Sequence, residues 1–210
     1  GNVRLDLMDL RNWDPRQLGE NIGYLPQDVQ LFPGTIKQNI GRMRPDATDE
    51  EVHRAAILAD VHEMISTLPQ GYETIVAADG APLSGGQKQR VNFARALAAE
   101  PDLILCDEIT SALDTVVAAA MLDLLKDLQR DLGLSYMFIS HDLSTVEAIC
   151  DDVLVMLKGK LVESLPAAHM SESAEHPYSR LLISSVPKLD PDWLANLEHN
   201  PELAKAMQGR

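Results

Sequence analysis

The two most informative stretches of the sequence are Leu83-Ser84-Gly85-Gly86-Gln87 and Leu103-Ile104-Leu105-Cys106-Asp107-Glu108. Adjacent glycines at the start of a helix let backbone N–H groups approach an anion, and the helix dipole favours negative charge there. The second stretch reads as a buried strand that ends on two acids. One carboxylate can hold Mg²⁺ through its waters and the other can orient or deprotonate a water molecule. Together they predict a phosphate-binding site.

The surrounding pattern predicts an α/β fold. A second apolar run at residues 136–139 ends on Ser140 and His141, and residues 115–132 between the two runs predict a helix. This βαβ unit predicts a buried parallel sheet, whose strands present polar groups at their carboxyl ends, where open α/β sheets bind ligands.

Other elements follow from local signals. Thr48 and Glu51 form a capping box, and an apolar face formed by Val52, Ala55, Ala56 and Ala59 predicts one helical stretch from residue 48 to about 68. We also expect strands at residues 3–7 and 21–25, a helix at 87–99, a hairpin at 153–163, and one or two short helices after Ser164.

Composition limits the possible functions. The chain has 18 basic and 32 acidic residues, a formal net charge of -14 and a pI near 4.7. This charge disfavours direct binding to nucleic acid. No apolar run approaches the roughly 20 residues that span a bilayer, so a membrane role requires a partner. Cys106 and Cys150 lack the spacing of a disulfide framework or zinc site, which fits a reducing compartment.

Further motifs complete a recognisable set. Gly-Tyr-Leu-Pro-Gln occupies residues 23–27, Ser-Ala-Leu-Asp follows Glu108 closely at 111–114, and His141 follows the second apolar run. With the two stretches quoted above, these motifs resemble the nucleotide-binding domain of ATP-binding cassette (ABC) transporters. They are similar, in family order, to the Q-loop, the signature, the Walker B strand, the D-loop and the switch histidine.

The resemblance implies a P-loop NTPase fold with a mostly parallel sheet and an inserted helical subdomain. It implies ATP and Mg²⁺ as cofactors, and ATP hydrolysis in a head-to-tail dimer with a second ABC ATPase domain. The implied catalytic residues are Glu108, His141 and Gln27, and the implied Mg²⁺ residues are Asp107 and Gln27. The residues implied to contact nucleotide are Ser84, Gly85, Gly86, Gln87 and Asp114.

One family motif does not occur. No G-x-x-x-x-G-K-[ST] sequence is found in the 210 residues, so the Walker A strand and loop are lacking and we expect the chain to be inactive alone. In the family, the Walker A strand lies between the strands that match residues 136–139 and 153–156. We therefore expect these two strands either to stand apart or to pair directly. Asp6-Leu7 replaces the family's Asp-Gly, which argues against a type I′ turn there.

The resemblance changes along the chain. Residues 1–97 resemble exporter and type I secretion cassettes, whereas residues 100–192 resemble oligopeptide and dipeptide importer ATPases. We expect a partial ATPase domain at residues 1–164, with its helical subdomain at about 36–100, and a peripheral helical tail at 165–210.

The predicted function is the ATPase subunit or domain of an ABC transporter for a peptide, protein or other substrate. Its expected partner is a transmembrane permease, which would hold it at the cytoplasmic face of the inner or plasma membrane. One alternative is a non-hydrolysing fragment that supplies a signature to another cassette. A second is an ABC-type DNA-repair ATPase, which the charge of -14 disfavours.

Overall fold

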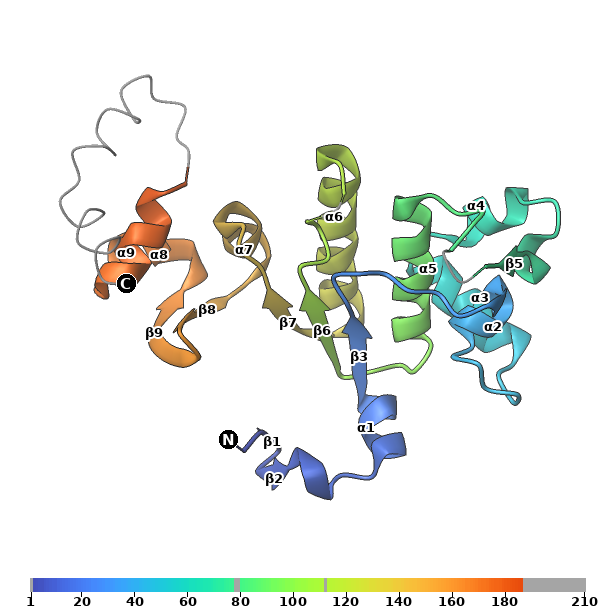
Figure 1. Cartoon of the computed structure of the whole chain (residues 1–210), viewed down its shortest axis with the longest axis horizontal. Helices are drawn as coiled ribbons and strands as arrows, with labels where there is room; N and C mark the ends of the chain where they lie inside the picture. Colours follow the sequence, from blue (N-terminus) through green and yellow to red (C-terminus); the bar gives the residue numbers. More distant parts are fainter. Residues whose placement is uncertain (1, 78–79, 112, 187–210) are drawn as a thin grey trace. The chain divides into compact units, whose positions relative to one another are not determined.

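A computed structural model describes residues 2–77, 80–111 and 113–186 of the chain (Figure 1). The chain divides into two compact units, residues 1–139 and residues 140–210, and each is described by itself. The domain boundary expected at residue 164 stays a prediction. The part of the predicted helical tail that falls on residues 187–210 lies outside the described residues.

A three-stranded parallel sheet forms the centre of the first unit. Its order is β3 (Ile22–Leu25), β6 (Leu103–Asp107) and β7 (Ser135–Ile139). The helix α6 (Thr115–Leu132) connects β6 to β7 and ends at Gly133, whose φ of 69° suits glycine. The predicted parallel βαβ unit is therefore confirmed.

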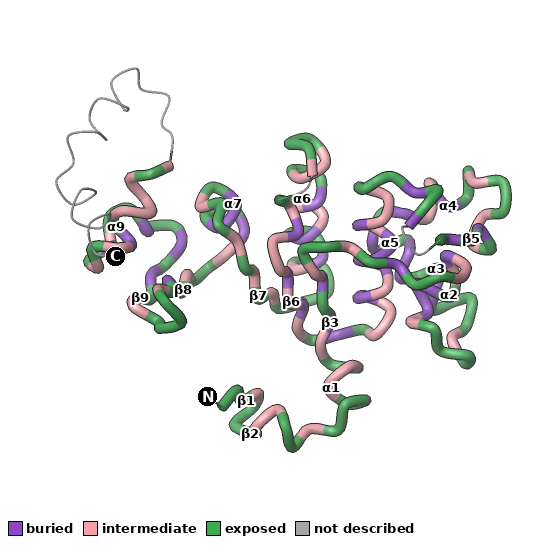
Figure 2. The backbone as a smooth tube through the Cα atoms, viewed as in Figure 1, coloured by how far each residue is buried: buried purple, intermediate pink, exposed green. Residues whose placement is uncertain are grey.

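Burial differs between the strands of this sheet, with buried residues in β6 and exposed residues in β7 (Figure 2). Ile104 and Cys106 of β6 are fully buried on one face. On the other face Met137 and Ile139 of β7 remain 53% and 47% exposed. The expectation that both apolar runs form buried strands is thus wrong for β7, because the described residues leave this side of the strand uncovered.

Helices and two short strands form the rest of the first unit after β3. In chain order they are β4 (Gly34–Thr35), α2 (Ile36–Ile40), α3 (Asp49–Leu58), α4 (His62–Thr67), η2 (Gly71–Glu73), β5 (Ile75–Val76) and α5 (Gly85–Leu97). The predicted stripe of α3 is confirmed, since Val52, Ala55 and Ala56 are almost completely buried. Phe93 of α5 is the largest fully buried side chain of this core.

The helix predicted over residues 48–68 is two helices. Asp60, with φ of 51°, directs its N–H to the Ile57 carbonyl, and the Val61 N–H bonds the Ala56 carbonyl. This pattern is a Schellman C-cap, which ends α3. Arg90 of α5 contacts both the backbone carbonyl and the carboxylate of Asp60. A tertiary contact therefore supports a non-glycine residue at the left-handed position.

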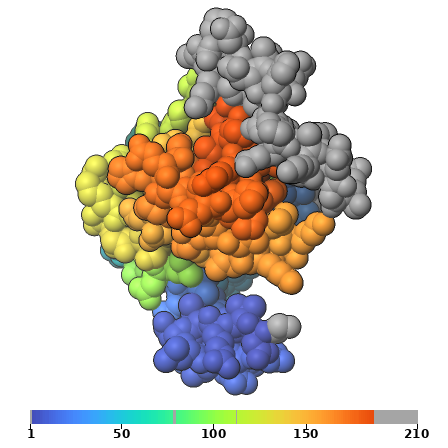
Figure 3. Space-filling view, turned by 90° about the vertical axis from the view of Figure 1, so that its left-hand side faces the viewer, coloured from blue at the N-terminus to red at the C-terminus, as the bar shows by residue number. Residues whose placement is uncertain are grey.

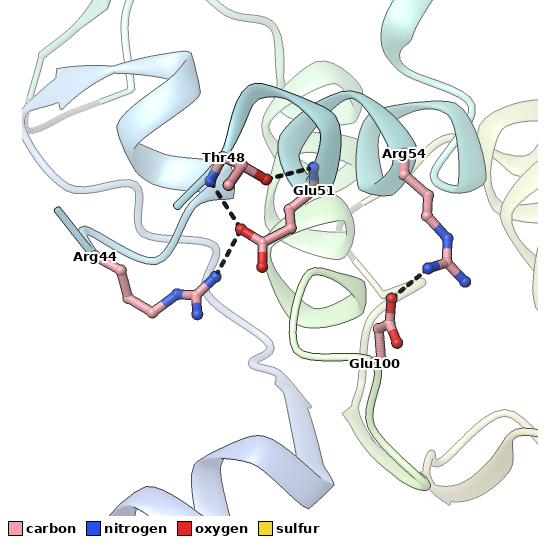
Figure 4. Close-up of polar contacts among 5 residues, drawn as sticks. All are labelled: Arg44, Thr48, Glu51, Arg54 and Glu100. Atoms are coloured by element: carbon pink, nitrogen blue, oxygen red, sulfur yellow. Dashed lines mark hydrogen bonds and ion pairs between the residues drawn. The ribbon is translucent and has the colours of Figure 1, made fainter. Parts of the chain in front are cut away.

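The start of α3 is fixed by polar contacts (Figure 4). The Thr48 hydroxyl accepts from the Glu51 N–H, and the Glu51 carboxylate accepts from the Thr48 N–H at 2.8 Å. Arg44 also bonds the Glu51 carboxylate, and Arg54 further along the helix pairs with Glu100. The predicted capping box is confirmed.

The amino-terminal segment is a hairpin of β1 (Arg4–Leu5) and β2 (Met8–Asp9), followed by η1 (Leu10–Asn12) and α1 (Pro15–Asn21). Asp6 and Leu7 both have positive φ, 47° and 67°, as a type I′ turn requires. Residues 6–7 therefore form the left-handed turn that the replacement of the family's Asp-Gly disfavoured, and the expectation against it is wrong. The left-handed conformation costs a non-glycine residue roughly 1–2 kcal/mol. The turn forms nevertheless, because its twist matches the twist of the paired strands.

The second unit contains a hairpin and short helices (Figure 1), and its described residues are drawn largely in orange to red in Figure 3. Its elements are α7 (Leu143–Ile149), β8 (Asp152–Leu157), β9 (Lys160–Pro166), η3 (Ala167–His169), α8 (Met170–Ser173) and α9 (Pro177–Ser184). The hairpin predicted at residues 153–163 is confirmed, and its turn is formed by Lys158 and Gly159. Within the described part of this unit, β8 pairs with β9, and the expectation about residues 136–139 and 153–156 stays a prediction because these strands belong to different units.

A half-buried carboxylate holds the segment before α9. One oxygen of Glu163 in β9 accepts from the N–H groups of Glu175 and His176, at 2.7 and 3.0 Å, just before α9 begins. The Ser179 hydroxyl, followed by these N–H groups, lowers the pKa of Glu163. A lowered pKa stabilises the fold above the ordinary carboxyl pKa, and the stabilisation is lost as the pH falls through the lowered value.

We expect Glu163→Gln to reduce amide hydrogen-exchange protection of α9 at neutral pH, and to remove the loss of protection that the parent chain shows on acidification. Glu175→Gln is the matched control, because Glu175 takes part through its backbone N–H. Equal loss of protection in both variants would show that the Glu163 carboxylate has no special part in holding α9.

Candidate functional site

The start of α5 is an open, capped helix terminus. The Ser84 hydroxyl accepts from the Gln87 N–H at 3.3 Å, and Gln87 Oε1 accepts from the Ser84 N–H at 2.9 Å. The first intrahelical bond runs from the Lys88 N–H to the Ser84 carbonyl. Helix geometry leaves the N–H groups of Gly85 and Gly86 without an intrahelical acceptor. These two groups can bind an anion.

The glycines of this terminus are not required by packing within the described chain. A Cβ at Gly85 would meet no atom within 4 Å, and one at Gly86 would meet only Val117 at an ordinary 3.4 Å. Neither residue has a positive φ. Their small size therefore matters only for a group that approaches from outside the described residues.

The two acids lie at the carboxyl end of β6. Asp107 is the last residue of the strand, and Glu108 follows with φ of 46°. The Glu108 N–H donates to the Ile139 carbonyl at 2.9 Å, and its carbonyl accepts from both the N–H and the hydroxyl of Ser111. Such a sparsely populated backbone conformation costs roughly 1–3 kcal/mol and is typical of functional sites. The backbone thus holds Glu108 in one orientation.

Side chains from β3 and the loop after it reach both acids. Gln27 Nε2 donates to Glu108 Oε2 at 2.9 Å, so the structure brings together Gln27, Asp107 and Glu108. The Tyr24 hydroxyl donates to Asp107 Oδ2 at 3.3 Å. Sequence reasoning missed Tyr24. The signal that could have revealed it is the pairing of two parallel strands, which no local pattern contains.

The remaining candidates lie at helix starts. Asp114 is the N-cap of α6, and its carboxylate accepts from the Val117 N–H at 3.0 Å. His141 belongs to the second unit and stands just before Asp142, the N-cap of α7. It is therefore described apart from Gln27, Asp107 and Glu108.

The donor set at the end of β6 suits Mg²⁺. Within the described residues, no group of three or more His, Cys, Asp and Glu side chains is arranged to hold a metal. However, Mg²⁺ keeps several of its waters and takes one or two carboxylates together with substrate phosphates. Asp107, Glu108 and the amide oxygen of Gln27 provide such hard oxygen ligands.

The family profile described as "ABC transporter" matches residues 1–111, more than half of the chain. The chain belongs to the ABC transporter family. A second profile, described as the C-terminal region of oligopeptide/dipeptide transporters, matches residues 162–209. The resemblance inferred from the sequence motifs is confirmed, including its mixture of exporter-like and importer-like parts.

Relatives of both kinds are similar to this ABC family member. The mitochondrial potassium channel ATP-binding subunit of Xenopus tropicalis is 46% identical over 164 residues, 78% of this chain and 23% of its own length. The type I secretion system ATP-binding protein PrsD of Rhizobium meliloti is 43% identical over 161 residues, 77% of this chain and 27% of its own. The Bacillus subtilis oligopeptide transport ATP-binding protein OppF is 46% identical over 138 residues, 65% of this chain and 44% of its own.

A solved structure supports the same fold. The structure of a bacterial Atm1-family ABC exporter with ATP bound matches 90% of this chain and 32% of that chain, with a TM-score of 0.76 and 33% identity. The expected P-loop NTPase fold class is confirmed. The chain spans less than half the length of these relatives. No described helix is long and apolar enough to cross a membrane.

Proposed function

We propose that this chain forms part of the ATP-hydrolysing domain of an ABC transporter, which works in a head-to-tail dimer with a second ABC ATPase domain. The observation that carries the proposal is the hydrogen bond from Gln27 Nε2 to Glu108 Oε2, next to Asp107 at the carboxyl end of β6. Such an arrangement suits phosphoryl transfer, which depends on positioning and charge neutralisation more than on covalent chemistry.

The acids have separate tasks in this proposal. Asp107 binds Mg²⁺, directly or through its waters, together with the amide oxygen of Gln27. Bound Mg²⁺ supplies charge neutralisation for the ATP phosphates. Glu108 accepts a hydrogen bond from the attacking water and orients it, and its fixed backbone keeps the carboxylate in place. Gln27 holds Glu108 and lies on the loop that couples the site to the membrane partner.

The α5 terminus serves the nucleotide of the opposite domain. Its open N–H groups and the absence of packing against Gly85 support contact with a γ-phosphate. The residues proposed for this contact are Ser84, Gly85, Gly86 and Gln87, with Asp114 facing the opposite domain. His141 is proposed to contact the γ-phosphate of the chain's own nucleotide.

The transmembrane partner is a permease domain or subunit, which holds the ATPase at the cytoplasmic face of the inner or plasma membrane. The charge of -14 supports a protein partner over nucleic acid. The similar proteins include secretion and oligopeptide transport components, so the direction and the substrate of transport are not part of the proposal.

The test is ATP binding and hydrolysis with and without a polypeptide that carries a Walker A strand and loop. The 210 residues contain no G-x-x-x-x-G-K-[ST] sequence. We therefore expect the chain alone to bind ATP-Mg²⁺ with a dissociation constant of about 1 mM or weaker, equivalent to about 4 kcal/mol.

Adding the Walker A polypeptide should produce hydrolysis, measured as phosphate release. Micromolar affinity of the chain alone in calorimetry would contradict the expected binding mode. A stable complex of the two polypeptides that binds ATP without hydrolysing it would instead favour the alternative of a non-hydrolysing partner.

A further inference from the structure

Tyr24 lies within the Gly-Tyr-Leu-Pro-Gln motif of residues 23–27, but the sequence analysis assigned it no role, and in the structure it contacts the proposed metal-binding acid. It lies in β3, and its hydroxyl donates to Asp107 Oδ2 at 3.3 Å, across 83 positions of sequence. Among the tyrosines of the described residues, Tyr72 instead bonds His62, at 2.8 Å. The Tyr24 hydroxyl therefore contacts the Asp107 carboxylate of the proposed site directly.

The strand register explains the contact. Tyr24 pairs with Leu105 in the parallel ladder between β3 and β6, and paired residues point to the same face of a sheet. Asp107 lies two residues beyond Leu105, so it shares this face. The diagonal separation of about 7–8 Å lies within reach of an aromatic side chain. The ring of Tyr24 therefore spans from one strand to the end of the next.

The contact leaves the acid available for a cation. Tyr24 occupies Oδ2 of Asp107 and leaves Oδ1 for a metal ion or its water. The next acid, Glu108, is held in the same way by a neutral donor, Gln27. Two adjacent carboxylates repel each other, and a hydrogen bond from a neutral donor to each one orients it without adding a charge.

We propose that Tyr24 is a positioning residue that orients the Asp107 carboxylate for Mg²⁺ through its hydroxyl, without touching the metal. This inference rests on the proposed function, in which Asp107 binds Mg²⁺. Groups that orient metal ligands commonly change metal affinity by about 10–100-fold when they are removed.

The experiment measures Mn²⁺ binding to the 210-residue chain by electron paramagnetic resonance, with Mn²⁺ as the probe for the magnesium site. Tyr24→Phe keeps the ring and removes only the hydroxyl, and we expect it to raise the dissociation constant about tenfold. Asp107→Asn should abolish binding at this site. Tyr178→Phe, in α9, is the matched control and should leave binding unchanged.

A second measurement, nuclear magnetic resonance, reports on the contact between Tyr24 and Asp107 while Tyr24 itself is unchanged. With ¹³Cζ-labelled tyrosine, Mg²⁺ should shift the Tyr24 resonance in the parent chain and should leave it unchanged in Asp107→Asn. This readout does not require the Tyr24→Phe variant to fold.

The outcomes separate the two proposals. Loss of binding in Asp107→Asn together with a change of less than about twofold in Tyr24→Phe overturns the role of Tyr24 and leaves the metal role of Asp107 intact. Unchanged binding in Asp107→Asn overturns the metal role in the proposed function, and the inference about Tyr24 with it.

Discussion

ATP turnover falls by a factor of roughly 100 or more in the Glu108→Gln variant, while ATP binding is retained, when the chain is supplemented with a Walker A polypeptide. Glutamine keeps the size of the side chain, but its amide is a poor acceptor for the proton of an attacking water. The variant should also trap the ATP-bound dimer, since the step that opens it no longer occurs. Phosphate release and light scattering measure the two effects.

Glu100→Gln provides a matched control for this prediction. Glu100 is an exposed glutamate that has positive φ, as Glu108 does, and its carboxylate pairs with Arg54. We expect ATP turnover of the Glu100→Gln variant to equal that of the parent chain. If turnover of Glu108→Gln stayed within about twofold of the parent, the assignment of Glu108 as the water-orienting base would be wrong.

The second large effect is expected for Ser84→Arg, in the same supplemented chain. The substitution places a long charged side chain at the open start of α5 and removes its capping box. We expect ATP binding to be retained but closure of the dimer to be blocked, because this terminus serves the nucleotide of the opposite domain. Turnover should fall by roughly 100-fold, the effect of misplacing a catalytic contact by about 1 Å.

Thr48→Arg separates this effect from the loss of a helix cap. Thr48 begins α3 with the same type of capping box, formed with Glu51, and lies in a different part of the first unit (Figure 4). Losing either cap costs about 1 kcal/mol of stability. Only Ser84→Arg should prevent formation of the ATP-bound dimer. Dimer formation is measured by size-exclusion chromatography with each substitution added to the Glu108→Gln variant. Normal closure of this variant would contradict the head-to-tail arrangement.

Most of the candidate site is visible in local sequence. The glycine pair after Ser84 predicts a capped helix start, and the apolar run before Asp107 and Glu108 predicts a strand with acids at its end. These signals act through neighbouring residues, because capping and strand alternation involve only a few positions along the backbone. The same local signals predict the parallel unit of β6, α6 and β7.

Local signals fail where a distant contact changes the balance. Asp60 ends α3 with the support of Arg90, 30 positions away, so one expected helix becomes two. Asp6 and Leu7 form a left-handed turn although neither is glycine, because the strands on either side of it pair. The contact from Arg90 in the first case, and the pairing of β1 with β2 in the second, outweigh the preference of non-glycine residues against a left-handed backbone.

The grouping of the site residues depends on strand order, which the motifs alone do not contain. Gln27 meets Glu108, and Tyr24 meets Asp107, only because β3 lies directly beside β6 in parallel register. The residue types and their chemistry are properties of the local sequence. Their contacts across more than 80 positions arise when the backbone groups of two separate strands satisfy each other and the two carboxyl ends reach the same edge of the sheet.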